Sequence, residues 1–401
     1  MMKYSLIIVG GGASGLMLSA MLQNERILLL ERGERLGRKL SATGNGQGNV
    51  TNLAVGKTDY FSQSAQGNFR VQRFLQTYGA EQMLAFLEGL GGLFLPDERG
   101  RVYPSGRQAS AVTDLLRFSL SENTDVRFNA YVSSVQKTKD GFQVTVQETD
   151  VEKRYFAENV VLCAGGKAAK NFGTDGNGYA LAKSLSHTVT PLYPSLVQLK
   201  TETKDIKGLK GLRVNGAHVS ACVAGKTVAA VKGDVIFTDY GVSGDAIFRL
   251  SAFIADKIDK ADVVLSIDFL PDVSEETLCE TLQKRDGKRG LTDSERLCGI
   301  VNNQIGRAIV KRYGQAISAL ARGMKSFTLA VTGSLGFDYA QVTKGGVCLD
   351  EVDDTLQSRF VKGLYFAGEI LDVDGECGGF NLQWAFTSAQ VVANAIGRGQ
   401  V

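Results

Sequence analysis

The first thirty residues hold the pattern that most constrains the fold. An apolar run at residues 4–9 leads directly into Gly10-Gly11-Gly12-Ala13-Ser14-Gly15. Such a run is typical of a buried parallel strand. An apolar helical pattern follows to about Leu22, and a second strand-like run ends at Glu31. This succession of strand, glycine turn, helix and strand predicts a Rossmann-type nucleotide fold.

The glycine turn and the acid after it predict the ligand class. The G-x-G-x-x-G positions are held by Gly10, Gly12 and Gly15. These glycines permit a tight turn, the approach of a pyrophosphate and close packing of the helix. Ala13 and Ser14 lie at the helix start, whose free amides attract phosphate. Glu31 lies about 20 residues beyond the first glycine, where a carboxylate binds ribose hydroxyls, so FAD or NAD is expected rather than NADP.

Composition narrows the class of protein. The 401 residues allow two or three domains. The net charge is only +3 and is spread along the chain, which argues against nucleic acid as the main partner. No apolar run spans a bilayer and no signal peptide is evident, so we expect a cytoplasmic protein without membrane contact. The six cysteines lack C-x-x-C and zinc spacing, so reduced thiols and no metal site are expected.

A second glycine-rich loop, residues 32–52, follows directly. The residues with ligand-binding potential in it are Arg32, Arg38, Lys39, Thr43, Gly44, Asn45, Gly46 and Asn49. A loop this rich in Gly, Asn and Thr cannot be core, because its backbone amides would lack partners. It can wrap a polar ligand, with Arg38 and Lys39 near the pyrophosphate. The alternative is a solvated surface loop.

The segment G-R-K-L-x-A-T-G-N-G-x-x-N-x-T-N after a Rossmann start resembles a family of bacterial NAD(P)/FAD-dependent oxidoreductases. That family includes the bile-acid reductase-like and aminoacetone oxidase-like flavoproteins. The resemblance covers nearly the whole chain and implies non-covalent FAD. It also implies the fold class: α/β, a Rossmann-type two-dinucleotide-binding-domain flavoprotein fold with an inserted antiparallel β-barrel and helical substrate domain.

The resemblance also suggests further cofactor contacts. Val132 falls where such proteins contact adenine through backbone atoms, and the small residues Ala164, Gly165 and Gly166 close the strand that approaches the cofactor. Gly368 and Glu369 end a later strand, where the carboxylate binds a ribityl hydroxyl. Gly379, Asn381 and Leu382 open a helix whose amides face the pyrimidine end of the flavin. That helix N-terminus favours negative charge on the reduced ring.

The chain departs from the family at three places. Gln47-Gly48 replaces the usual Arg-Cys pair, so no role of that cysteine carries over. Asp239 and Asp245 replace His and Pro in the family's F-T-H-x-G-x-S-G-P. Imidazole chemistry is therefore excluded at residue 239.

A change from α/β patterns to successive strand-like runs in the middle of the chain suggests a discontinuous FAD domain. We expect residues 1–190 and 326–401 to form it and residues 191–325 to form the insert. Strand-like runs at Leu196–Leu199, Ala217–Val223, Thr227–Val231, Val235–Phe237 and Val263–Ile267 predict the barrel. Residues 274–320 read as helical, and residues 69–90 read as one amphipathic helix. Thr174 or Asp175 is the expected N-cap of the helix that follows.

The sequence does not assign a catalytic acid or base. Asp239 and Cys377 are the candidates, although Cys377 fits a small packing residue better. His187 is expected at the surface, and His218 is expected to face solvent. The chemistry left open is an NAD(P)H-linked reductase of an unsaturated or carbonyl small molecule, which is favoured, an O2-using amine oxidase, or a non-catalytic FAD-binding protein.

The expected domain arrangement also predicts where the substrate and the electron donor bind. We expect the substrate between the flavin and the insert. With one G-x-G-x-x-G in the chain, NADH or NADPH would dock only transiently. The oligomeric state is left open.

Overall fold

The computed structural model describes residues 3–56, 60–149, 151–285, 291–292 and 294–397. They divide into two compact units. Unit 1 comprises Met1–Tyr193 and Val342–Val401, and unit 2 is Pro194–Gln341. Among the described residues, no helix is long and apolar enough to cross a bilayer.

The main sheet of unit 1 follows the order β7-β2-β1-β10-β9-β8, with β19 also paired to β10. Its strands are β1 Lys3–Val9, β2 Ile27–Leu30, β7 Thr124–Arg127, β8 Ala130–Thr138, β9 Gly141–Glu148, β10 Val151–Leu162 and β19 Leu364–Phe366. β1 pairs in parallel with β2 and β10, while β10 pairs antiparallel with β9 and parallel with β19. β1 and β2 are apolar on both faces because helices cover parallel sheets on both sides. The predicted Rossmann-type fold is confirmed.

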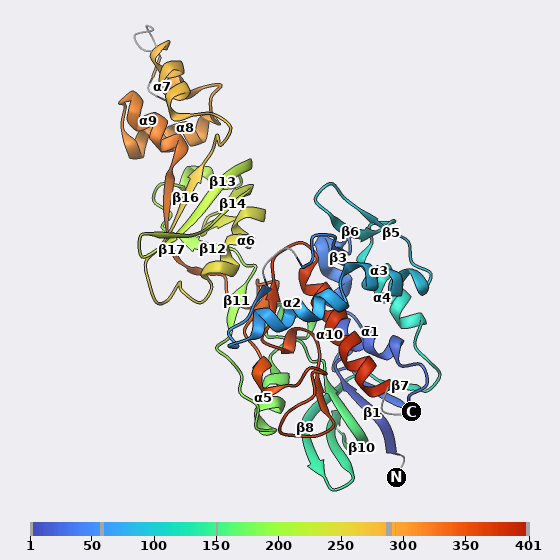
Figure 1. The fold of residues 1–401 in the computed structure, drawn as a ribbon. Coiled ribbons are helices and arrows are strands. Elements are labelled where there is room, and N and C mark those ends of the chain that lie inside the picture. Colours follow the sequence, from blue (N-terminus) through green and yellow to red (C-terminus); the bar gives the residue numbers. More distant parts are fainter. Residues whose placement is uncertain (1–2, 57–59, 150, 286–290, 293, 398–401) are drawn as a thin grey trace. The chain divides into compact units, whose positions relative to one another are not determined.

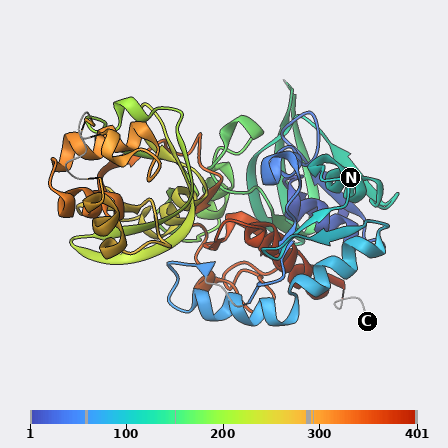
Figure 2. The same cartoon turned by 90° about the horizontal axis from the view of Figure 1, so that it is seen from above.

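Helices and short strands cover this sheet. The α-helices of unit 1 are α1 Ala13–Met21, α2 Gly67–Thr77, α3 Ala80–Gly89, α4 Ala109–Phe118, α5 Asn177–Ser184 and α10 Phe380–Gly397. The 3-10 turns are η1 Leu40–Gly46, η2 Lys170–Phe172, η5 Leu349–Glu351 and η6 Gly368–Ile370. The short strands are β3 Thr51–Asn52, β4 Tyr60–Phe61, β5 Phe94–Pro96, β6 Arg101–Pro104, β18 Val342–Lys344 and β20 Asp374–Gly375. Figures 1 and 2 both show the blue N-terminal and red C-terminal segments interleaved in this unit.

The helix expected at residues 69–90 is two helices. The break falls at Tyr78 and Gly79, where Gly79 has extended φ/ψ angles and is the N-cap of α3. A glycine costs helical stability because it loses more backbone freedom than other residues. The amphipathic pattern continues across the break, so periodicity alone did not reveal it.

Unit 2 contains a closed antiparallel barrel in the order β12-β15-β14-β13-β16-β17. Its strands are β12 Leu199–Thr201, β13 Arg213–Val223, β14 Lys226–Phe237, β15 Gly241–Ser243, β16 Val263–Asp268 and β17 Phe327–Ser334. The other elements are η3 Lys207–Leu209, α6 Asp245–Ile254, α7 Glu275–Gln283, η4 Glu295–Leu297, α8 Asn303–Tyr313 and α9 Ile317–Lys325. The predicted barrel is confirmed, with alternate residues such as Val219, Leu265 and Phe327 buried.

Three details of the insert differ from the sequence reading. β17 lies beyond the expected boundary at residue 325 and closes the barrel against β16, so the insert is longer than expected. The strand expected at Leu196–Leu199 is interrupted, because Leu196 is left-handed at φ +52°, and the flanking strands are β11 Tyr193–Ser195 and β12. The two strands expected within residues 227–237 are one, β14. Residues 286–290 of the expected helical stretch lie outside the described residues.

Candidate functional site

The glycine turn after β1 is open at Gly12 and tightly packed at Gly10 and Gly15. A Cβ built on Gly12 would meet no atom within 4 Å, so this face of the turn is open. A Cβ on Gly15 would collide with the carbonyl oxygen of Gly10, and one on Gly10 would lie 2.5 Å from the carbonyl oxygen of Cys163. Tight packing on one side and open space on the other agree with the roles expected of these three glycines.

Glu31 follows β2, and backbone amides hold its carboxylate in place. The amide of Gly11 donates to Oε2 at 3.0 Å and the amide of Gly33 donates to Oε1 at 2.7 Å. A carboxylate accepts about four hydrogen bonds, so capacity for two ribose hydroxyls remains. The amide of Ala130 donates to the carbonyl of Glu31, which brings the start of β8 to this carboxylate. In β8 the carbonyl of Val132 accepts from Asn177 Nδ2 at 2.9 Å.

Arg32 and Asp175 form an ion pair near this end of the site, 2.6 Å between Nη1 and Oδ2. Partial burial raises the pKa of Asp175, but the hydrogen bonds from Arg32 and the Asn177 amide, together with the Arg32 charge, outweigh this and hold the pKa below its ordinary value. The N-cap expected at Thr174 or Asp175 is wrong. Gly176 is the N-cap of α5 at φ +83°, and no side chain caps the helix. Asp175 instead accepts from the amide of Asn177.

Glu369 is the second carboxylate of the site, on η6 after β19. Lys39 Nζ lies 2.7 Å from its Oε2, and the amide of Thr343 donates to Oε1 at 2.9 Å. A Cβ on Gly166 would lie 2.6 Å from the same Oε1, which explains why the segment Ala164-Gly165-Gly166 after β10 ends in small residues. Four segments distant in sequence therefore meet at this carboxylate.

The first turn of α1 adjoins the same place. A Cβ on Gly368 would lie 2.5 Å from Ser14 Oγ, and this hydroxyl donates to the carbonyl of Ala367. Figure 1 shows α1 and α10 side by side in unit 1, as their packing contacts require. The phosphate turn and the Gly368-Glu369 turn thus form one continuous surface.

The N-terminus of α10 forms the third part of the site. Its first-turn amides, including those of Asn381 and Leu382, have no acceptor within the helix and carry the positive end of its dipole. The Asn381 side chain accepts from the amide of Gly375 at 2.9 Å and donates to its carbonyl at 2.8 Å. A Cβ on Gly379 would lie 2.6 Å from Asn49 Oδ1, which is buried and accepts no hydrogen bond from the described residues.

These groups fit FAD. The open turn suits a pyrophosphate, the carboxylates suit hydroxyls, and the Asn49 oxygen together with the helix amides suits the polar edge of a flavin.

Left-handed backbone angles and side-chain hydrogen bonds to carbonyls give the 32–52 loop a defined conformation. Gly44, Asn45 and Gly46 take left-handed φ values of +58°, +54° and +83°. Thr43 Oγ1 donates to the carbonyl of Leu40, and Arg38 Nη2 donates to the carbonyl of Asn171. The contacts predicted between these residues and the ligand stay predictions.

Neither candidate catalytic residue is assigned a role by its surroundings. Asp239 lies exposed on the turn between β14 and β15, and a hydrogen bond from Lys210 at 2.8 Å lowers its pKa. Cys377 is half-buried in the turn before α10. The six cysteines form no disulfide, and the described residues contain no cluster of metal-ligating side chains. Burial raises the pKa of the Cys163 thiol to about 12, which leaves it unreactive beneath the glycine turn.

The expectation for His187 is wrong. Its side chain is buried, its Nε2 lies 2.7 Å from Ser358 Oγ, and its ring packs edge-on against Phe366. Burial lowers the pKa of His187, and the neighbouring Glu351 partly opposes this. His218 is exposed on β13, as expected. Neither imidazole is placed among the cofactor-binding groups of unit 1 described above.

Tertiary contacts give two residues of the site roles that the sequence did not assign to them. Thr343 Oγ1 accepts from the amides of Lys167 and Ala168 at 2.8 and 2.9 Å, and so joins β18 to the segment after β10. From the sequence, Thr343 is expected only as part of the family-like turn of residues 343–347 on the flavin side. Asp372 is buried and binds residues 62–64, a partnership across some three hundred positions that no local pattern reveals.

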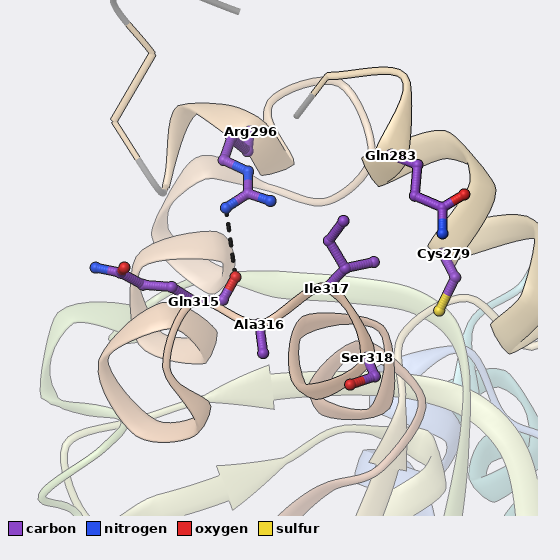
Figure 3. Close-up of a pocket in the computed structure, with 7 residues that line it drawn as sticks. All are labelled: Cys279, Gln283, Arg296, Gln315, Ala316, Ile317 and Ser318. Carbon is purple, nitrogen blue, oxygen red and sulfur yellow. Dashed lines mark hydrogen bonds between the residues drawn. The ribbon is translucent and has the colours of Figure 1, made fainter. Parts of the chain in front are cut away.

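A separate hollow of about 620 Å³ opens in the helical part of unit 2. Residues of α7, η4 and α9 line it, among them Cys279, Gln283 and Arg296. Figure 3 shows Arg296 reaching across to the carbonyl of Gln315, which accepts from its Nη1 at 3.3 Å. None of the glycine turns or carboxylates described above contributes to this hollow, so it is not the site that the motifs define.

The model of the HI0933-like protein Rossmann domain matches residues 4–395. The chain belongs to this family. It is 33% identical to a 3-dehydro-bile acid delta(4,6)-reductase from Clostridium scindens, over 97% of this chain and 98% of the relative. It is 29% identical to a ribosomal RNA dihydrouridine synthase from Escherichia coli, over 98% of both chains. These relatives and the family place the chain among FAD-binding oxidoreductases.

Solved structures agree on the fold. The 3-ketosteroid delta1-dehydrogenase from Sterolibacterium denitrificans superposes with a TM-score of 0.54 at 14% identity, with both chains fully covered. At this identity the likeness shows only the fold.

Proposed function

We propose that the chain is an FAD-dependent reductase of a small molecule in which a carbon–carbon double bond is conjugated to a carbonyl group. The electron source is NADH or NADPH. The net reaction adds one hydride and one proton across the bond and oxidises one NAD(P)H to NAD(P)+. Conjugation matters because the carbonyl oxygen accepts the charge that hydride addition creates.

The observation that carries the proposal is the convergence in unit 1 of the glycine turn, Glu31, Glu369 and the α10 amides. Bound FAD supplies hydride transfer through its N5. The chain itself holds the cofactor at both ends. The α10 N-terminus places positive partial charge where the reduced ring is negative. Lys39 and the Thr343 amide fix the Glu369 carboxylate.

The names of the relatives support a double bond as the target. One is named for reducing the delta(4,6) double bonds of a 3-dehydro-bile acid, and the other for making dihydrouridine. Both names describe the saturation of a carbon–carbon bond. An amine oxidase or a non-catalytic FAD-binding protein has no comparable support.

Anaerobic absorbance measurements test the proposal. NADH or NADPH should bleach the flavin band, and an enone should restore it without oxygen. A suitable panel contains a 3-oxo-4-ene steroid, a cyclic enone and uracil. Bleaching by a small amine, with peroxide formed in air, would establish the oxidase instead. A flavin that no nicotinamide bleaches would contradict the reductase.

A second candidate substrate, a uracil base within RNA, is favoured by the charge of unit 2. Residues 296–337 contain six Lys or Arg and no Asp or Glu. Arg307 and Lys311 are exposed one turn apart on α8, and within the described residues neither forms an ion pair. Unpaired cations of this kind attract the phosphate backbone. The balanced charge of the whole chain conceals this local excess.

Reduction of ribosomal RNA transcribed in vitro separates the two substrates. With NADPH present, mass spectrometry should find dihydrouridine if RNA is the substrate. The yield should then fall with salt and in the double variant Arg307→Ala/Lys311→Ala. Lys226→Ala, an exposed cation on the β13–β14 hairpin, is the matched control. If the RNA is unchanged and an enone is turned over, the substrate is the small molecule and not RNA.

A further inference from the structure

The turn between β19 and α10 is held by a second segment, which we call the strap, residues 60–64. Asp372 lies in this turn and is fully buried. Its Oδ2 accepts four hydrogen bonds from the strap: Ser62 Oγ at 3.0 Å, and the Gln63 amide, the Ser64 amide and Ser64 Oγ at 2.8 Å each. Burial raises the pKa of Asp372, and the hydrogen bonds from the strap partly oppose this because they favour the carboxylate.

The strap holds the same turn at two further points. β4 in the strap pairs antiparallel with β20, so that Tyr60 lies opposite Gly375 and Phe61 opposite Asp374. Tyr60 Oη donates to the carbonyl of Phe380, the first residue of α10, at 3.0 Å. The strap therefore spans the whole stretch from Asp372 to the first turn of α10.

We propose that Asp372 is a positioning residue that, through the strap, fixes the α10 amides against the pyrimidine edge of the flavin. Glu369 lies three residues before Asp372, and Gly379 and Asn381 lie shortly after it. Movement at Asp372 therefore changes the distance between the ribityl-binding carboxylate and the helix N-terminus. The inference rests on FAD binding alone and holds whichever substrate the reductase takes.

The test is the two-electron reduction potential of bound FAD, measured anaerobically against a reference dye in Asp372→Ala. Loss of positioning withdraws positive partial charge from the reduced ring, so the potential should fall. The equilibrium constant for reduction should drop at least tenfold, about 30 mV for a two-electron couple. Removing a negative charge acting only through space would raise the potential, so the sign separates the two explanations.

Further variants keep the test decisive if Asp372→Ala does not fold. Ser62→Ala removes one of the four donors and should lower the potential by a smaller amount. Asp372→Asn retains an acceptor oxygen and should lie between the wild type and Asp372→Ala. The control is Ser358→Ala, another buried oxygen of unit 1 that accepts several hydrogen bonds, from the amides of Phe360 and Val361.

The control should lower the melting temperature and leave the potential unchanged. A lower melting temperature with an unchanged or raised potential in the Asp372 and Ser62 variants would overturn the proposal. That result would leave the reductase proposal intact, because this experiment uses no substrate.

Discussion

Glu31 and Glu369 are two carboxylates at the ends of strands that flank the central β1–β10 pair, and they are held in different ways. Backbone amides alone hold Glu31, within 2.7 and 3.0 Å. Glu369 is held by one amide and by the side-chain ammonium of Lys39. The first arrangement is built into the fold of β2 and its turn. The second depends in part on a side chain from a segment distant in sequence.

The difference teaches how a long cofactor is accommodated. For the adenosine end we expect a carboxylate that is already in place, because the partners of Glu31 are fixed backbone amides. At the ribityl end the sequence predicts Lys39 near the cofactor's phosphates, so we expect binding to redistribute its contact with Glu369. A rigid end and an adjustable end should respond differently to substitution.

The largest effect is expected at the rigid end. Glu31→Ala removes charge-assisted hydrogen bonds to the ribose, worth about 1.5–3 kcal/mol, or roughly ten- to hundredfold in FAD affinity. Fluorescence titration of the FAD-free protein measures the affinity. Glu34→Ala, an exposed acid three residues later, should change nothing. Equal affinity in both variants would show that the end of β2 does not bind the ribose.

A smaller effect is expected at the adjustable end. Glu369→Gln should weaken FAD by about 1 kcal/mol, roughly fivefold, because an amide keeps part of the hydrogen bonding. Lys39→Met should cost a similar amount. A double-mutant cycle of the two measures their coupling. Strict additivity would mean that the ion pair contributes nothing once FAD is bound.

Acidification should affect the Glu369 side of the sheet through His187, which packs on Phe366 at the end of β19. Burial places its pKa in the folded protein below the ordinary value of about 6.5. The unfolded chain therefore binds more protons below about pH 6.5, and stability is lost as the pH falls from there toward the folded pKa. Melting temperatures between about pH 7 and pH 5 should decline in the wild type and less in His187→Gln. Parallel curves would rule out His187 as the titrating group.

The smallest effect on the cofactor is expected far from both carboxylates in sequence. Asp239→Asn removes an exposed ion pair with Lys210 in unit 2. FAD content and the flavin spectrum should stay as in the wild type, while turnover or KM for the substrate changes. Lys210→Met is the matched control for loss of the ion pair alone. If neither the spectrum nor the kinetics changes in Asp239→Asn, this turn has no part in substrate binding.

Local patterns predicted the rigid end, and the family resemblance predicted Glu369, but only tertiary contacts show what holds Glu369 in place. The strand, glycine turn and Glu31 lie within thirty residues, so spacing alone located them. Lys39 could be predicted as a cation near phosphate, but its pairing with Glu369 spans 330 positions. His187 was misplaced because its burial depends on Ser358 and Phe366, which arrive late in the chain. β17 was assigned to the FAD domain because no local sequence pattern shows that this strand pairs with β16 to close the barrel.

The interleaving of unit 1 also bears on how the protein is made. Unit 2 is one continuous run of sequence, so its barrel can close once β17 has been synthesised. β1 and β2 form early, but β19 and α10 are added only after residue 364. Such long-range pairing slows folding, because the chain loses conformational entropy in closing a long loop before the stabilising contacts form. Until then the nascent chain holds Glu31 and the glycine turn without Glu369 and the α10 amides, so we expect complete binding of FAD only after α10 has been synthesised.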